Sequence, residues 1–127
     1  MIIADTNIII DFWNNPTEKE REVFEKNDIA TCGVIKAELL RGSRSEEQFL
    51  MFDNALNNFI YLPFNEEDWI KLAKNFIEFR KNGLVVPFQD GMIAYLGIKY
   101  NCHICTNDKH FKLIQTILPK LQLFTVL

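Results

Sequence analysis

Five short apolar runs, separated from one another by helical stretches, constrain the fold of this chain most strongly. They predict strands at residues 2–5, 29–32, 59–62, 102–106 and 121–127. The segments between them carry apolar residues at helical spacing and residues that commonly cap helices. Strands that alternate with helices form a mainly parallel sheet covered by helices on both faces. We therefore expect a single α/β domain over residues 1–127, a three-layer α/β/α sandwich with a mainly parallel sheet of four to five strands.

The composition fits one globular domain. The chain has 127 residues, of which 48% are hydrophobic and 24% charged, and a chain of this length can bury a core. No apolar run approaches the roughly 20 residues that span a bilayer, and no signal-like segment opens the sequence, so we expect a cytoplasmic protein. The net charge of −3 argues against generic nucleic-acid binding through a basic surface. It does not exclude a nucleic-acid enzyme, because four acids gathered at a metal site would account for the negative net charge.

Three cysteines, Cys32, Cys102 and Cys105, predict neither a disulfide framework nor a zinc site. Cys102 and Cys105 are spaced like half of a zinc site. However, residues three apart on a strand point to opposite faces, and the sequence has no second pair. We expect three buried thiols.

Four acids follow a predicted strand or lie on the helix beside it. Asp5 and Asp108 follow the first and fourth strands, at the carboxyl edge of the sheet, where ligand sites form in α/β proteins. Glu38 lies in the helix after the second strand, and Asp90 lies in the first turn of a later helix. If these strands are neighbours, the acids converge. Carboxylates suit Mg²⁺ or Mn²⁺, and they repel one another unless a cation lies among them.

Each acid also has a purely structural explanation. Thr6 or Asn7 is the expected cap of the first helix, but Asp5 can serve instead. Asp90 and Asp108 can stabilise helix N-termini in the same way. Glu38 can pair with Arg41 on the surface, where such a pair contributes little. Spacing alone does not decide between these explanations and a shared site.

Two helices carry further local predictions. Ser45 and Gln48 have the spacing of a capping box. After Asn65, an apolar stripe at helical spacing predicts the packed face of the longest helix. The stripe consists of Trp69, Leu72, Ala73, Phe76, Ile77 and Arg80.

An ordered set of motifs resembles the PIN domain, and more closely the short VapC-type toxins of toxin–antitoxin pairs. The motifs are Asp5-Thr6-Asn7, Glu38-Leu39 with Arg41-Gly42, Asn82-Gly83 seven residues before Asp90, and Thr106-x-Asp108-x-x-Phe111. The resemblance covers essentially the whole chain and implies a PIN-like fold. One departure is His110, which precedes Phe111 where an acid is frequent in the family.

The resemblance implies a metal-dependent endoribonuclease, the toxin of a type II toxin–antitoxin pair. Asp5, Glu38, Asp90 and Asp108 match the catalytic acids that hold one or two Mg²⁺ or Mn²⁺ ions, and a metal-activated water would hydrolyse the RNA phosphodiester. We assign Asp5 and Asp90 as the more direct ligands and Glu38 and Asp108 as outer or second-metal ligands. The supporting positions are Thr6, Asn7 and Thr106. Asp11 is interpreted as a helix-surface acid.

The resemblance also implies partners: an RNA substrate, a cognate antitoxin and a second copy of the chain in a homodimer. The candidates for RNA binding are Lys36, Arg41, Arg44 and Lys109, although each also fits a solvated surface residue. Family members bind the antitoxin along a groove formed by early helices. Phe12, Trp13, Phe49, Phe52 and Phe59 suit such a groove, although an aromatic stripe also fits an ordinary core.

The same residues leave two alternative functions open and exclude two other classes of protein. A solitary PIN nuclease in RNA processing and a non-catalytic PIN-like binding module keep the fold and remain alternatives. An aspartate-nucleophile phosphatase needs an acid at Asn7, and a receiver needs a phosphoaccepting Asp after the third strand, where Pro63-Phe64-Asn65 stands. These two classes are therefore excluded.

Overall fold

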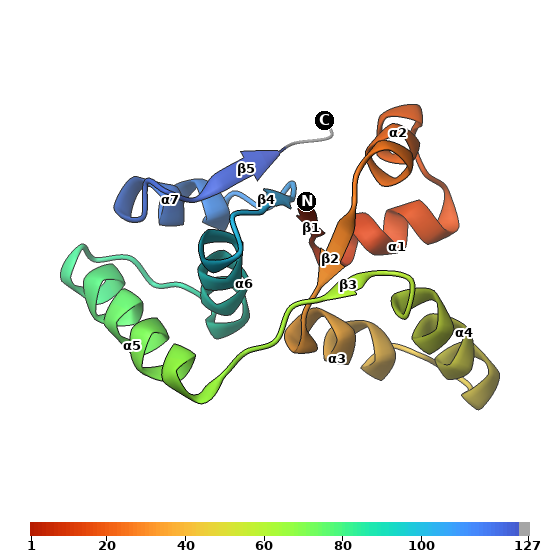
Figure 1. Cartoon of the computed structure of the whole chain (residues 1–127), viewed down its shortest axis with the longest axis horizontal. Coiled ribbons are helices and arrows are strands. Elements are labelled where there is room, and N and C mark those ends of the chain that lie inside the picture. Colours follow the sequence, from red (N-terminus) through yellow and green to blue (C-terminus); the bar gives the residue numbers. More distant parts are fainter. Residues whose placement is uncertain (125–127) are drawn as a thin grey trace.

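The computed structural model describes residues 1–124 and contains the expected parallel sheet (Figure 1). Its strand order is β3-β2-β1-β4-β5, and every neighbouring pair is parallel. The strands are β1 (Ile2–Ala4), β2 (Ile29–Thr31), β3 (Ile60–Tyr61), β4 (His103–Cys105) and β5 (Gln122–Phe124). The α/β prediction is confirmed, and the predicted last strand is present as far as Phe124. Its remaining part, residues 125–127, lies outside the described residues.

Within residues 1–124, helices connect these parallel strands. They are α1 (Thr6–Asn14), α2 (Glu18–Lys26), α3 (Gly33–Arg41), α4 (Glu46–Leu56), α5 (Glu66–Lys81), α6 (Phe88–Lys99) and α7 (His110–Ile117). In Figure 1, α1 to α4 group around β2 and β3, whereas α5, α6 and α7 group around β4 and β5. None of the helices described is long and apolar enough to cross a membrane.

The central strand β1 lies in the middle of the core. Ile2, Ile3 and Ala4 are all buried, and Ile2 is in register with Ile29 of β2 on one side and with His103 of β4 on the other. Because β1 has a hydrogen-bonded neighbour on each side, its carboxyl end lies between those of β2 and β4. The residues that follow these three strands therefore meet at one edge of the sheet.

The first turn of α5 is fastened to α6 by a buried carboxylate. Asp68 has no exposed surface, and it accepts hydrogen bonds from the Tyr95 hydroxyl, from Lys99 Nζ at 2.8 Å and from the Asn65 backbone N–H at 2.7 Å. Burial alone would raise the pKa of Asp68, but these bonds outweigh it and lower the pKa to about 2. Asp68 is therefore ionised at neutral pH and holds α5 against the last two turns of α6.

This contact changes which face of α5 is packed. The residues that α5 buries are Asp68, Leu72 and Phe79. The stripe predicted from the sequence was therefore partly wrong, since four of its six members are exposed: Trp69, Ala73, Ile77 and Arg80. The face of α5 that carries Asp68 lies toward Tyr95 and Lys99, because the buried carboxylate needs these hydrogen-bond donors.

The predicted capping box of α4 is only half formed. The Gln48 backbone N–H donates to Ser45 Oγ at 3.0 Å, as expected for an N-cap. The Gln48 side chain, however, accepts a hydrogen bond from the Arg44 backbone N–H at 2.7 Å. A full capping box would instead have it accept from the Ser45 backbone N–H. The start of α4 is thus stabilised one residue earlier than the box predicts.

We predict that Asp68→Ala lowers the free energy of unfolding by about 2–4 kcal/mol, because Tyr95 and Lys99 would lose their shared acceptor in a buried place. Urea unfolding followed by circular dichroism measures the change. Glu67→Ala is the matched control, since Glu67 is the exposed neighbour on the same helical turn and should change stability very little. Equal effects of the two substitutions would contradict this role for Asp68.

Candidate functional site

The carboxylate of Asp5 is held by hydrogen bonds to both of its oxygens. The Asp5 backbone N–H extends the sheet by donating to the Cys105 carbonyl at 2.9 Å. Its Oδ1 accepts from the Thr6 backbone N–H at 2.8 Å, and its Oδ2 accepts from Thr106 Oγ1 at 2.9 Å. Asp5, and neither Thr6 nor Asn7, is therefore the N-cap of α1. The carboxylate is fixed at the carboxyl end of β1.

Thr106 joins the ends of β1 and β4. Its side chain is buried, and while Oγ1 donates to Asp5 it also accepts the Asp108 backbone N–H at 3.0 Å. One hydroxyl thus sets the distance between the turn that follows β1 and the turn that follows β4. The supporting role predicted for Thr106 stays a prediction, and its hydroxyl lies between Asp5 and Asp108.

Glu38 reaches the same edge from α3. Its Oε2 accepts from Thr6 Oγ1 at 3.1 Å, and Thr6 is itself buried. Among residues 1–124, Glu38 forms no ion pair with Arg41, so the surface-pair explanation does not hold. Thr6 connects Glu38 to Asp5 through its side chain and its backbone.

Asp90 enters from the first turn of α6. Gly97 allows that helix to lie against β4, since a Cβ at Gly97 would stand 2.8 Å from Ile104 Cδ1. The Asp90 carboxylate faces Asp108 across His110, whose Nδ1 lies 3.3 Å from Asp90 Oδ2 and 3.2 Å from Asp108 Oδ1. One ligand atom from each of these three side chains lies within 4.8 Å of the other two. The acids predicted from the sequence therefore meet at one edge of the sheet.

Burial and mutual repulsion perturb two of the acids. Burial raises the pKa of Asp5, with a smaller contribution from Asp108. Burial together with the charges of Asp108 and Asp5 raises the pKa of Asp90 to about 6, although His110 opposes the shift. Like charges held this close favour a bound cation, and carboxylate oxygens are the donors that Mg²⁺ and Mn²⁺ prefer. The donor set therefore fits a divalent metal.

The other predicted residues lie around this cluster. Asn7 is exposed, and its side chain has no hydrogen-bond partner among the described residues. Lys36 Nζ lies 4.0 Å from Asp53 Oδ1, so part of its charge is used within the protein. Arg41, Arg44 and Lys109 are exposed and form no ion pair within residues 1–124.

His110 is the member of the cluster that sequence reasoning did not place in the site. The available signal was its position two residues after Asp108, where the family often carries an acid. In the structure its backbone N–H donates to Asp108 Oδ1 at 2.9 Å, so the residue is held beside the acids at the start of α7.

The three cysteines are buried, free thiols, as predicted. Burial raises the pKa of Cys105 to about 11, so this sulfur stays protonated at neutral pH. Thiolates, which zinc and redox chemistry both require, are therefore disfavoured.

The chain belongs to the PIN domain family, whose model matches residues 2–116. The sequence is 29% identical over 114 residues to Ribonuclease VapC1 of Methanocaldococcus jannaschii, in an alignment that covers 87% of this chain and 79% of that protein.

Solved structures agree with this assignment. A chain of VapBC2 from Rickettsia felis, bound to a DNA fragment from its promoter, superposes with a TM-score of 0.81 at 27% identity and 98% coverage of each chain. A chain of VapBC-1 from nontypeable Haemophilus influenzae gives a TM-score of 0.82 at 23% identity, with 99% of this chain and 98% of that chain covered. The second similarity supports the fold alone.

We predict that Asp90→Asn stabilises the metal-free protein at pH 7.5 by about 1–3 kcal/mol, since each pKa unit corresponds to about 1.4 kcal/mol. The folded-state pKa of Asp90 lies above its value in the unfolded chain. Ionisation therefore costs stability as the pH rises from about 4 to 6, and the full cost remains above that range.

Thermal unfolding in chelator checks this prediction. The difference between Asp90→Asn and wild type should shrink toward about pH 3, which lies below the pKa of Asp90 in both the folded and the unfolded state. Asp11→Asn, at an exposed acid on α1, should match wild type at both pH values. A variant no more stable than wild type at pH 7.5 would show that burial and the neighbouring charges do not penalise the ionised form of Asp90.

Proposed function

We propose that the protein is a divalent-metal-dependent endoribonuclease and the toxin of a type II toxin–antitoxin pair. The observation that carries the proposal is the meeting of Asp5, Glu38, Asp90 and Asp108 at the carboxyl edge of β1 and β4, in a chain of the PIN family. The ribonuclease and VapBC relatives favour this function over a solitary nuclease in RNA processing or a non-catalytic module. The cytoplasm, where RNA substrates lie, is the expected compartment.

The four acids would hold one or two Mg²⁺ or Mn²⁺ ions, with Asp5 and Asp90 as the more direct ligands. When bound, the metal would lower the pKa of a water molecule and stabilise the negative charge on the phosphate oxygens. Asp5 is suited to ligation because Thr6 and Thr106 already fix the orientation of both its oxygens. Glu38, held through Thr6, is placed to orient a water or to accept its proton.

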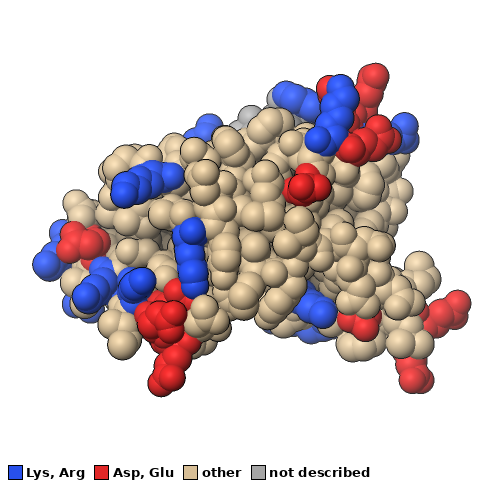
Figure 2. All heavy atoms as spheres, in the orientation of Figure 1, with Lys and Arg blue, Asp and Glu red and all other residues tan. Residues whose placement is uncertain are grey.

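The face of the molecule shown in Figure 2 has no broad basic area. The face in Figure 2 is mostly uncharged, with basic and acidic side chains in small mixed groups. RNA binding would then depend on a few cations near the acids. Arg41, Arg44 and Lys109 are the better candidates, whereas Lys36 is partly neutralised by Asp53.

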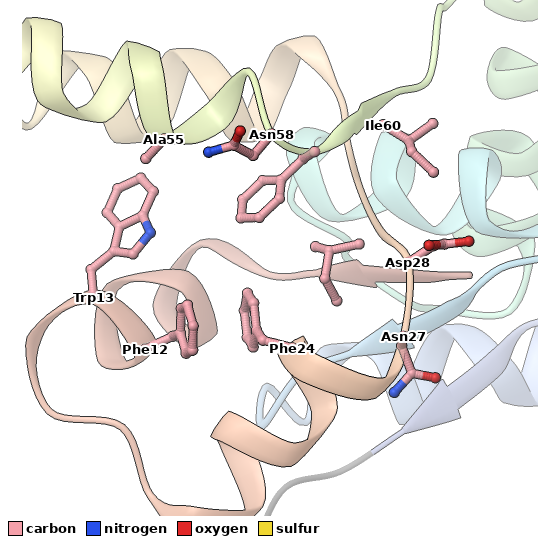
Figure 3. Close-up of a pocket in the computed structure, with 10 residues that line it drawn as sticks. Phe12, Trp13, Phe24, Asn27, Asp28, Ala55, Asn58 and Ile60 are labelled. Carbon is pink, nitrogen blue, oxygen red and sulfur yellow. The ribbon is translucent and has the colours of Figure 1, made fainter.

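For the antitoxin, the best supported surface is an aromatic pocket of about 360 Å³ between α1, α2 and the end of α4 (Figure 3). The labelled rings of Phe12, Trp13 and Phe24 point into the space below Ala55 and Asn58. Phe12 stacks on Phe24 with ring centroids 3.9 Å apart. The pocket is open and lined by both aromatic and amide groups, which suits an apolar anchor of a protein partner. The product of a short neighbouring gene is the partner to test by co-purification.

For the homodimer, an exposed apolar area lies beside α5. Tyr61 is 54% exposed and Trp69 is 49% exposed, and the two border a pocket of about 340 Å³ that Val34 and Met92 also line. Large apolar side chains grouped in this way mark interaction surfaces. A second copy of the chain is the proposed occupant.

We predict that Trp69→Glu converts this dimer into a monomer, because a charge would be buried without a partner at the interface. Light scattering coupled to size-exclusion chromatography measures the mass. Leu50→Glu, at an equally exposed apolar residue on α4, should leave the dimer intact. A wild-type protein that is monomeric at high micromolar concentration would rule out the dimer.

We predict that RNA cleavage requires Mg²⁺ or Mn²⁺, stops with chelator, and falls about a hundredfold or more in Asp5→Asn. Asn also caps helices well, so this variant should keep its fold. Gel analysis of a broad RNA panel measures cleavage, and Asp11→Asn is the control that should retain activity. If wild type with metal leaves every RNA uncut, or if Asp5→Asn cuts as well as wild type, the proposed function is wrong.

A further inference from the structure

We propose that His110 is a nitrogen ligand of the metal that Asp90 and Asp108 hold, and that this nitrogen makes the site prefer Mn²⁺ and later first-row transition ions to Mg²⁺. This inference rests on the proposed function, because it concerns the metal of that same site. It adds a residue that the four-acid pattern does not contain, and it names the chemical class of ion that the residue selects.

The geometry of the three side chains matches one edge of a metal's coordination shell. Nδ1 of His110 lies 3.3 Å from Asp90 Oδ2 and 3.2 Å from Asp108 Oδ1. In an octahedral site with bonds of about 2.1 Å, adjacent ligand atoms lie about 3.0 Å apart. The imidazole nitrogen therefore already stands close to the distance from each carboxylate oxygen that two ligands of a single ion require.

The position of His110 is held by the backbone. It is the first residue of α7, and its own N–H donates to Asp108 Oδ1 at 2.9 Å. Its side chain is 48% exposed, whereas those of Asp108 and Asp90 are 37% and 15% exposed. An ion can thus enter from the solvent side, and the imidazole closes the cluster on that side. Within residues 1–124, this is the one group of three such side chains with the spacing of a metal site.

The identity of the added ligand determines which ions benefit. Mg²⁺ binds mainly oxygen and retains its waters, so replacing an oxygen ligand by imidazole increases the affinity for Mg²⁺ little. Transition ions bind nitrogen more strongly, and their affinity rises along the series from Mn²⁺ to Cu²⁺. An acid at position 110 would favour Mg²⁺, whereas His110 favours Mn²⁺ and the ions after it. His110, in place of the acid that is frequent in the family, would thus shift the metal selectivity of the site from Mg²⁺ toward Mn²⁺.

The competing arrangement is an ion pair. A protonated His110 can lie between two carboxylates in the metal-free protein and swing away when a cation enters. The two arrangements differ in whether nitrogen touches the bound metal, which pulsed electron paramagnetic resonance of Mn²⁺ detects directly through its coupling to ¹⁴N.

The experiment uses the full-length protein loaded with one equivalent of Mn²⁺, as wild type, His110→Gln and His103→Gln. His103 is the other histidine of the chain; it is exposed and lies at the start of β4, at the opposite end of that strand from the acids. We expect ¹⁴N coupling in wild type and His103→Gln and its loss in His110→Gln. Calorimetry should show that Mn²⁺ affinity falls about tenfold or more in His110→Gln, while Mg²⁺ affinity changes much less.

The outcomes separate the two proposals. If Mn²⁺ binds and Asp90→Asn weakens it, but wild type shows no ¹⁴N coupling, His110 is not a ligand while the metal-dependent function stands. If His110→Gln weakens Mn²⁺ and Mg²⁺ equally, the selectivity is wrong. If wild type binds neither ion at millimolar concentration, both this inference and the metal dependence fail.

Discussion

Repulsion among carboxylates at one edge of the sheet is the constraint on which the arrangement of this protein depends. The parallel pairing of β1 with β4 brings Asp5 and Asp108 to the same edge, and α6 adds Asp90. Burial raises the pKa of both Asp5 and Asp90, and the charges of the neighbouring acids raise these pKa values further. Thr6 and Thr106 oppose this effect by supplying donors that fix Asp5 in one orientation. These hydrogen bonds keep Asp5 in place despite the repulsion from the neighbouring carboxylates.

The structural and functional explanations of the acids are not alternatives. Asp5 is the N-cap of α1, Asp108 accepts the first backbone N–H of α7, and Asp90 lies in the first turn of α6. The N-terminus of a helix carries partial positive charge, so each of these helices favours the negative charge of the acid near its start. Three helix N-termini directed at one place make it possible to gather acids there without a metal always present.

Much of the fold could be predicted from sequence, because strands and caps are local signals. The apolar runs predicted all five strands, and Asp5 and Asp108 follow two of these strands closely. What local signals could not show is which helix face is packed. Asp68 lies in the first turn of α5, where acids are usually exposed, but its carboxylate is buried and bonded to Tyr95 and Lys99, 27 and 31 residues later. His110 was left outside the predicted site for the same reason: its partnership with Asp90 depends on how α6 and α7 meet.

The hydrogen bond between Thr106 and Asp5 joins residues 101 positions apart. The central strand β1 is therefore synthesised well before its partner β4. During translation β1 can pair early only with β2, and the edge that gathers the acids does not exist until residues 103–110 have left the ribosome. Contacts so distant in sequence form late in folding. Any reaction at this edge therefore cannot begin in a growing chain until β4 and Asp108 have been made.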